Sequence, residues 1–217
     1  MSYLDMIVDL LRGLAVSVEV FVFTLLVALP LGFPIALGRM SRNRLVSGVF
    51  RLYVSIVRGT PLMLQIIFVY FSPYVLFGLP LSRYPRLLAT VVAFGLNYAA
   101  YFAEIYRGGI LSIERGQREA AAAMGFAQGQ TFFRIILPQV VKRVIPAVGN
   151  EIITLVKDTA LANVLAIPEI IKCARDMAAT KALVWPLFYT AAFYLLFVGL
   201  LTVLLSKLEK KLDYFKV

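Results

Sequence analysis

The chain has 217 residues, of which 61% are hydrophobic and only 16% charged, and its mean hydropathy is +0.85. An average soluble domain is about 45–50% apolar, so this composition excludes an ordinary globular protein and favours a polytopic membrane protein. The net charge of +10 is explained better by basic cytoplasmic loops than by nucleic-acid binding. Because the chain has no His and its only cysteine is Cys173, disulfides, His-based catalysis and Cys/His metal sites are excluded.

Long uncharged runs predict where the chain crosses the membrane, since a helix needs about 20 apolar residues to span the hydrocarbon core. Four such runs are evident, and residues 144–168 are apolar apart from Glu151, Lys157 and Asp158. We expect this fifth segment to cross as well, because ionisable residues at membrane depth usually have a function. The prediction is one all-helical domain, residues 1–217, with transmembrane helices at about 13–38, 59–80, 87–106, 144–168 and 182–206.

Basic residues are unevenly distributed between the two sides that five crossings define. Loop 39–58, loop 107–143 and the C-terminal tail together hold fifteen Lys and Arg residues, whereas the segments on the other side hold six. Cytoplasmic loops of membrane proteins are enriched in Lys and Arg. The bias therefore predicts that the N-terminus lies outside and the C-terminus in the cytoplasm.

The predicted cytoplasmic loop 107–143 contains a short helix. Residues 117–124 are strong helix formers, and Gly125 directly after them is suited to end a helix in the left-handed conformation. The alanines at 120–123 are too small to form a core, but they allow a partner protein to approach closely. The sequence therefore predicts a helix displayed outside the membrane for contact with another protein.

A motif with two fixed spacings runs through this loop. Glu119-Ala120-Ala121 is followed after three residues by Gly125, and after nine more by Ile135-Ile136-Leu137-Pro138. This pattern resembles the signature of bacterial ABC importer permeases. Further segments resemble the polar amino-acid branch of that family, namely Arg58-Gly59-Thr60-Pro61, residues 97–104, Gly116-Gln117 and Lys157-Asp158-Thr159. The resemblance covers nearly the whole chain and implies the type I importer permease fold in the bacterial inner membrane.

The resemblance also implies a division of labour between subunits. The short helix would be a coupling helix that docks on a separate ATP-hydrolysing subunit through Glu119, Ala120, Ala121 and Gly125. The partners implied are two ATPases, a second permease subunit that is identical or related, and an extracytoplasmic binding protein that delivers a polar amino acid. The chain lacks a Gly-x-x-x-x-Gly-Lys-Ser/Thr loop, so we expect ATP and Mg²⁺ in the partner, no cofactor here, and no enzymatic activity of this chain.

Polar residues recur on one side of two predicted spans. Asn97, Tyr101 and Glu104 are spaced by four and three, and residues 150, 151, 154, 157 and 158 recur at helical spacing in the fourth span. A zwitterionic amino acid needs partners for its carboxylate and for its ammonium group. The predicted substrate-binding residues are therefore Asn97, Tyr101, Glu104, Lys157 and Asp158.

Lys157, or a helix N-terminus at a broken span, would hold the carboxylate, and Asp158 or Glu104 would hold the ammonium group. Alternatively, these charged residues pair with one another as structural ion pairs. Glu19 in the first span has no assigned role.

Two other functions remain open at this stage. A secondary transporter would use Glu104 or Asp158 as a proton or cation site, and it would need neither nucleotide nor the loop helix. A membrane scaffold would have no pathway, and its polar stripes would be inert. The sequence decides neither which amino acid is carried nor whether the permease pairs with itself or with a relative.

Overall fold

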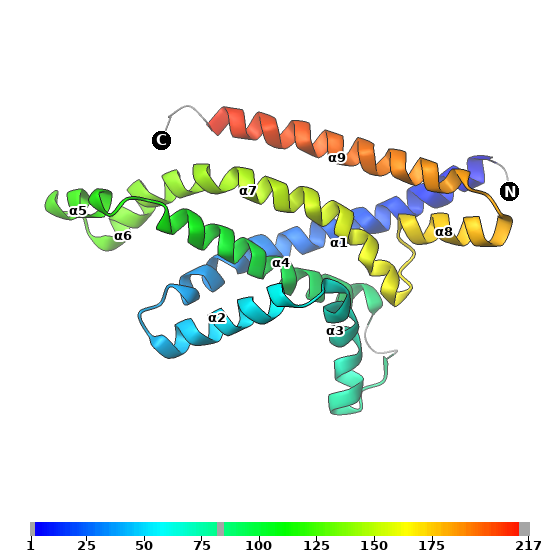
Figure 1. Ribbon diagram of the computed structural model, residues 1–217, viewed down its shortest axis with the longest axis horizontal. Coiled ribbons are helices and arrows are strands. Elements are labelled where there is room, and N and C mark those ends of the chain that lie inside the picture. Colours follow the sequence, from blue (N-terminus) through cyan, green and yellow to red (C-terminus); the bar gives the residue numbers. More distant parts are fainter. Residues whose placement is uncertain (1–2, 82–84, 213–217) are drawn as a thin grey trace.

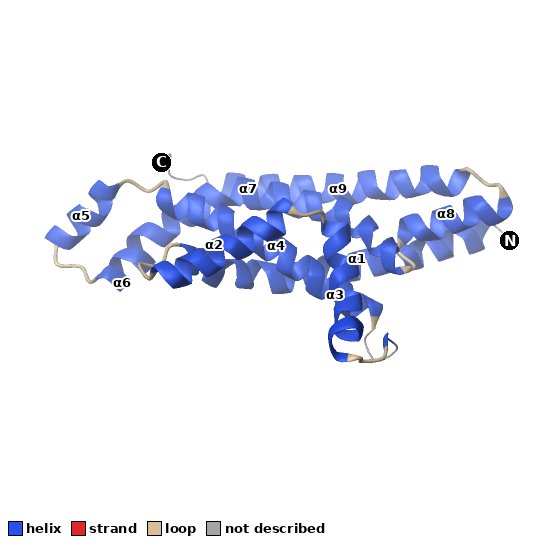
Figure 2. Ribbon diagram, turned by 60° about the horizontal axis from the view of Figure 1, so that its bottom comes forward, coloured by secondary structure: helices blue, strands red, loops and turns tan. Residues whose placement is uncertain are grey.

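The computed structural model describes residues 3–81 and 85–212, and all regular structure in this part of the chain is helical (Figure 2). Most long helices run side by side along one axis, whereas α3 leaves the bundle at a steep angle (Figure 1). The predicted all-helical class is confirmed. The α-helices are α1 (Tyr3–Arg39), α2 (Arg44–Gly59), α3 (Leu62–Phe77), α4 (Arg86–Leu111), α5 (Arg115–Ala123), α6 (Gln128–Thr131), α7 (Leu137–Asp158), α8 (Ile170–Lys181) and α9 (Trp185–Leu212). A π-helix (Phe132–Ile136) precedes α7, and a 3-10 helix (Thr159–Leu165) follows it.

Three helices in the described residues are long and apolar enough to cross a membrane, namely α1, α4 and α9. A fourth crossing results if α2 and α3, which meet at an angle of 112°, form one broken span. Helix α7, which contains most of the predicted fourth span, is not among them because charged residues are spread along its length. Length and composition therefore support three or four crossings.

The second predicted span corresponds to α3, but the preceding segment is not a simple loop. Asn43 caps α2 by accepting a hydrogen bond from the Leu45 N–H at 2.9 Å. Helix α2 then runs back along the bundle, where the Tyr53 hydroxyl donates to the Leu96 carbonyl of α4 at 2.6 Å. Thr60 ends α2 and does not cap α3, since its hydroxyl donates to the Ile56 carbonyl.

The central packing joins α1 to α4 through small residues. A Cβ atom on Gly32 would lie 2.9 Å from the Phe102 Cβ and 3.2 Å from the Ala103 nitrogen, so only glycine allows the two helices to approach this closely. Phe94, Tyr98 and Phe102 of α4 are fully buried in this core. Membrane helices associate through such close van der Waals packing, because lipid tails are as apolar as the side chains. The α1–α4 pair therefore forms the frame of the bundle.

The two ends of the bundle differ. Helices α5 and α6 lie at one end, whereas α8 lies at the other beside the start of α1 (Figure 1). There a Cβ atom on Gly13 would lie 2.8 Å from the Ile170 Cα. The start of α1 and the end of α9 lie toward opposite ends (Figure 1). Only 6% of the most apolar window of α9 is buried, against 61% for α4, so α9 offers most of its surface to lipid or to another protein.

Candidate functional site

The loop helix is present where the sequence predicts it. Helix α5 covers Arg115–Ala123, and Gly125 after it has φ +82. The Gly125 N–H donates to the Ala122 carbonyl and the Phe126 N–H to the Ala121 carbonyl, both at 3.0 Å. This pair of bonds is a Schellman motif, which satisfies the last carbonyls of a helix and requires a left-handed residue. The predicted left-handed role of Gly125 is confirmed.

The predicted coupling residues lie on different sides of α5. Glu119, Ala120 and Gly125 are exposed, and Glu119 forms no ion pair with any described residue. Ala121 is fully buried and faces the rest of its own chain. The surface open to a partner is therefore Glu119 and Ala120 together with the small side chains of Ala122 and Ala123.

Hydrogen bonds connect α5 to the start of α7. The side-chain amides of Gln117 and Gln139 donate hydrogen bonds to each other, with 3.0 Å between the Gln117 Nε2 and the Gln139 Oε1. The Gln139 amide also donates to the Ile135 carbonyl at 2.7 Å. Arg143 of α7 donates to the Ser112 carbonyl at 2.6 Å, directly before α5. These hydrogen bonds tie α5 and the residues before it to the first part of α7.

A second polar cluster lies midway along the bundle. The Tyr98 hydroxyl of α4 donates to an Asp158 carboxylate oxygen at 2.7 Å, which joins α4 to the end of α7. The guanidinium of Arg58, near the end of α2, lies 4.9 Å from the centre of the Tyr101 ring. Arg58 is also close enough to Glu151 of α7 for their charges to attract. Tyr101 and Asp158, two of the predicted site residues, thus belong to one cluster.

Asn97 contacts the break between α2 and α3. Asn97 is 4% exposed, and its amide donates to the Gln65 side chain of α3 at 3.0 Å. Gln65 in turn donates to the carbonyls of Val57 and Thr60, at 2.8 and 3.1 Å. Asn97 therefore supports the bend between these helices, and its amide is already engaged.

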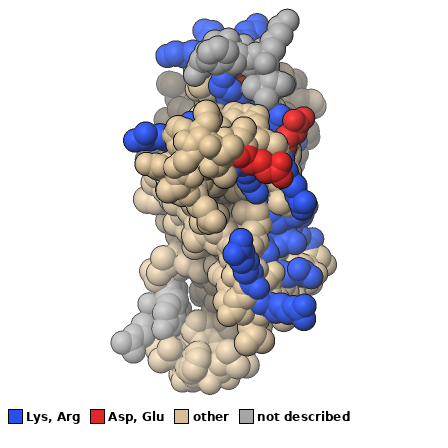
Figure 3. All heavy atoms as spheres, turned by 90° about the vertical axis from the view of Figure 1, so that its left-hand side faces the viewer, with Lys and Arg blue, Asp and Glu red and all other residues tan. Residues whose placement is uncertain are grey.

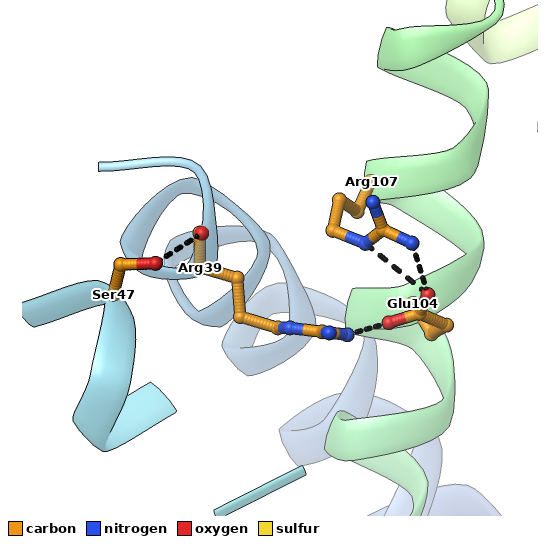
Figure 4. A network of polar contacts seen from close by, with 4 residues as sticks. All are labelled: Arg39, Ser47, Glu104 and Arg107. Atoms are coloured by element: carbon orange, nitrogen blue, oxygen red, sulfur yellow. Dashed lines mark hydrogen bonds and ion pairs between the residues drawn. The ribbon is translucent and has the colours of Figure 1, made fainter. Parts of the chain in front are cut away.

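Glu104 is held by two arginines from different helices. Its carboxylate pairs with Arg39 at the end of α1 and with Arg107 one turn further along α4, whose Nε donates to it at 3.1 Å (Figure 4). Only 24% of the Glu104 side chain is exposed. The negative charge of Glu104 is therefore neutralised by two arginines of the same chain.

The polar face of α7 is open to the outside of this chain. Asn150, Thr154 and Lys157 are exposed, and Lys157 forms no ion pair with any residue that the structure describes. An ionisable group in contact with lipid costs about 2.5–3.5 kcal/mol on insertion scales. This face must therefore contact water or another protein subunit. Glu19 is likewise exposed, and no described interaction assigns it a role.

Sequence reasoning missed a group of arginines beside the bundle. The sequence predicts that Arg51 and Arg58 lie in loop 39–58, yet they belong to α2 and line a pocket of about 430 Å³, called here the arginine pocket. Its lining residues are Arg39, Arg51, Val54, Ser55, Arg58, Gly59 and Glu104. The seven-residue spacing of Arg51 and Arg58 was the available signal, because it places both side chains on one face of a helix.

Comparison with protein families gives this arrangement a context. Residues 28–214 match the family described as "Binding-protein-dependent transport system inner membrane component". The chain belongs to this family. It is therefore a membrane component of a transport system, not itself an enzyme. Membership and the apolar helices also make it a multi-pass membrane protein.

Individual relatives of this permease cover nearly its whole length. It is 37% identical to the arginine transport system permease protein ArtQ of Bacillus subtilis (strain 168), over 94% of this chain and 92% of that protein. It is 35% identical to the L-cystine transport system permease protein TcyB of the same organism, over 93% and 85%.

Solved structures agree with this assignment. The fold matches a chain of an amino acid ABC transporter crystallised with histidines, with a TM-score of 0.86, 29% identity, and coverage of 97% and 99%. A chain of the MetNI methionine ABC transporter shares the fold at TM-score 0.77 and 19% identity, over 98% of this chain and all of that one.

Proposed function

We propose that this permease belongs to an ATP-driven importer and forms the pathway for a polar amino acid. The observation that carries the proposal is the exposed helix α5, closed by Gly125 and tied by the Gln117–Gln139 pair to α7, which bears the polar face. A secondary transporter or a scaffold would have no use for such a connection. The relatives named for arginine and cystine transport support a polar amino acid as the substrate.

The proposed topology has five crossings, made by α1, the broken pair α2–α3, α4, α7 and α9, with the N-terminus outside. It overlaps the predicted ranges 13–38, 59–80, 87–106, 144–168 and 182–206, with coupling loop 107–143, and α2 adds Arg44–Gly59 to the second crossing. Support comes from the opposite placement of the start of α1 and the end of α9 (Figure 1). Seen from the end that carries α5 and α6, Lys and Arg side chains are spread over the visible face and are more numerous than Asp and Glu (Figure 3), as expected for a cytoplasmic end. Leaving Arg51 and Arg58 out of the count does not reverse the charge bias.

The proposed assembly pairs this permease with a second permease subunit. The exposed Asn150, Thr154 and Lys157 cannot face lipid cheaply, so they would line a cavity between the two subunits. Two ATPases, which bind ATP and Mg²⁺, would hold the α5 helices through Glu119, Ala120 and Gly125, while Ala121 anchors α5 to its own chain. An extracytoplasmic binding protein would deliver substrate in the bacterial inner membrane.

The proposed substrate site lies along the polar face of α7 and the facing side of α4. Asp158 would hold the ammonium group, with Tyr101 beside it, and Lys157 or another cation of the cluster would hold the carboxylate. Asn97 and Glu104, from the same face of α4, would shape the site from behind, since their polar groups already have partners in Gln65, Arg39 and Arg107.

The decisive experiment reconstitutes the permease in proteoliposomes with the ATPase and the binding protein encoded beside it. ATP hydrolysis and uptake are measured with each of a panel of amino acids, and with an imposed ion gradient in place of ATP. We expect stimulation by one or a few polar amino acids and no uptake without ATP. Hydrolysis that responds to no amino acid would refute the substrate assignment, and uptake driven by the gradient alone would support a secondary transporter.

A further inference from the structure

The arginine pocket carries an excess of positive charge. It contains one carboxylate, Glu104, which Arg39 and Arg107 already neutralise. Arg51, Arg58 and Arg107 are all close enough to Arg39 for their charges to repel it. Neither Arg51 nor Arg58 forms an ion pair with any described residue. The pocket is therefore suited to receive an anion.

Arg58 is exposed on the surface of this chain, but an aromatic ring of α4 fixes its position. Its guanidinium is stacked on Tyr101, which is ten residues, or about 15 Å, along α4 from Leu111. Stacking on a ring fixes the plane of the guanidinium while its N–H groups remain available, because the interaction uses the face of the cation. Beside the transmembrane helix α4, Arg58 has only the more distant charge of Glu151 near it and no ion pair with a described residue. Such an arginine is costly in a bilayer, which points to a ligand that supplies further negative charge.

The chain on either side of Arg58 adds to this preference for anions. Gly59 lines the pocket and no atom would lie within 4 Å of a Cβ there, so the backbone is accessible. Three residues after Gly59 α3 begins, and the positive end of its dipole lies at the break in the α2–α3 span. Ser55, one turn before Arg58, contributes a hydroxyl to the same pocket.

We propose that Arg58 binds the carboxylate of the transported amino acid, with Arg51 and Ser55 completing the subsite. The inference rests on the proposed function and deepens it. Guanidinium binds carboxylate through two parallel hydrogen bonds, a geometry that the ammonium group of Lys157 cannot provide. With Arg58 at the carboxylate, the nearby Glu151 and Asp158 remain on the other side of the cluster for the ammonium group. The substrate is thereby oriented along the line from α2 to α7.

The test measures equilibrium binding to the purified complex without the binding protein, so that selection by that protein does not contribute. The probes are L-arginine, L-glutamine and L-histidine, each compared with its α-carboxamide, in nanodiscs of phosphatidylcholine. The wild-type complex should bind the amino acid at least tenfold more tightly than its amide. Arg58→Gln should bring this ratio close to one, and Arg58→Lys should restore only part of it.

Matched variants separate this role from a general loss of charge. Arg44→Gln removes the same charge from the same helix, two heptads before Arg58 and outside the pocket, and should keep the wild-type ratio. Lys157→Gln should lower the ratio much less than Arg58→Gln. The melting temperature of each variant identifies any that fail to fold. Tyr101→Leu removes the ring beneath Arg58, and in a folded protein it should lower the ratio of the two affinities.

Several outcomes would overturn the proposal. A folded Arg58→Gln complex with the wild-type ratio, or a ratio lost in Lys157→Gln instead, would place the carboxylate elsewhere. If Arg58→Gln changes only the retention of phosphatidylglycerol in mixed nanodiscs, the anion is a lipid headgroup. If amino acids stimulate hydrolysis by the wild-type complex, but Arg58→Gln leaves the amino-acid-to-amide affinity ratio unchanged, the subsite is wrong while the proposed function stands.

Discussion

The left-handed turn at Gly125 allows a sharp test of the coupling helix. A residue with a Cβ costs about 1–2 kcal/mol at a left-handed position, and a β-branched side chain is among the least tolerated. The structure leaves nothing within 4 Å of a Cβ at Gly125, so the Cβ atom itself meets no neighbour and the cost of adding it comes from the backbone. A cost of 1–2 kcal/mol lowers the ratio of molecules with the Schellman motif to molecules without it about 5–30-fold.

The assay compares uptake with phosphate release in the same proteoliposomes. We expect Gly125→Val to lower uptake per ATP hydrolysed, by at most about 5–30-fold, whereas Gly125→Asn should change it little because Asn tolerates this conformation. Gly129→Ala in α6 is the matched control, since Gly129 has equally open surroundings and a helical backbone in which alanine is favourable. The reasoning fails if Gly125→Val keeps the wild-type ratio, or if Asn and Val are equally harmful.

Three further predictions concern the bundle. Glu104→Gln removes the shared partner of Arg39 and Arg107 and should lower the free energy of unfolding by about 1.5–3 kcal/mol. Asp9→Asn, in the exposed Asp9–Arg12 pair, should lower it by less than about 0.5 kcal/mol. Equal losses for the two variants in denaturation experiments would contradict this. Tyr98→Phe and Asp158→Asn should show a coupling energy of about 0.5–3 kcal/mol in a double-mutant cycle on stability, and additive effects would mean that the hydrogen bond contributes nothing. Burial, with smaller effects from Glu169, Asp176 and Asp9, raises the pKa of the Cys173 thiol, so a membrane-impermeant maleimide should label it slowly at neutral pH and faster as the pH rises. Labelling of α8 only after permeabilisation would reverse the proposed orientation.

Local features of the chain could be predicted because the residues themselves determine them. Helix α5 and the turn at Gly125 depend on helix propensity and on the one residue type that adopts positive φ cheaply. The position of the break before α3 follows from Gly59, Thr60 and Pro61. None of these features needs knowledge of what packs against them.

Partners across the bundle could not be predicted, because helical spacing gives the face of a residue but not its neighbour. Asn97, Tyr101 and Glu104 share a face as expected, yet one bonds to Gln65, one stacks with Arg58 and one pairs with arginines from two helices. The position of Arg58 was missed for a related reason. Counting charges assigns an arginine-bearing segment to a loop, although α2 is a helix that packs along α4.

The two ends of α7 connect the coupling surface to the polar cluster. Its 22 residues extend about 33 Å, close to the thickness of the hydrocarbon core, with Gln139 bonded to α5 near one end and Asp158 bonded to Tyr98 at the other. Tyr98 belongs to α4, which the Gly32 contact packs tightly against α1. If α5 moves α7 against this frame, the Tyr98–Asp158 bond and the space between Asp158 and Arg58 must change together. Hydrolysis in a partner bound to α5 would thus alter the site itself, since α7 carries both contacts.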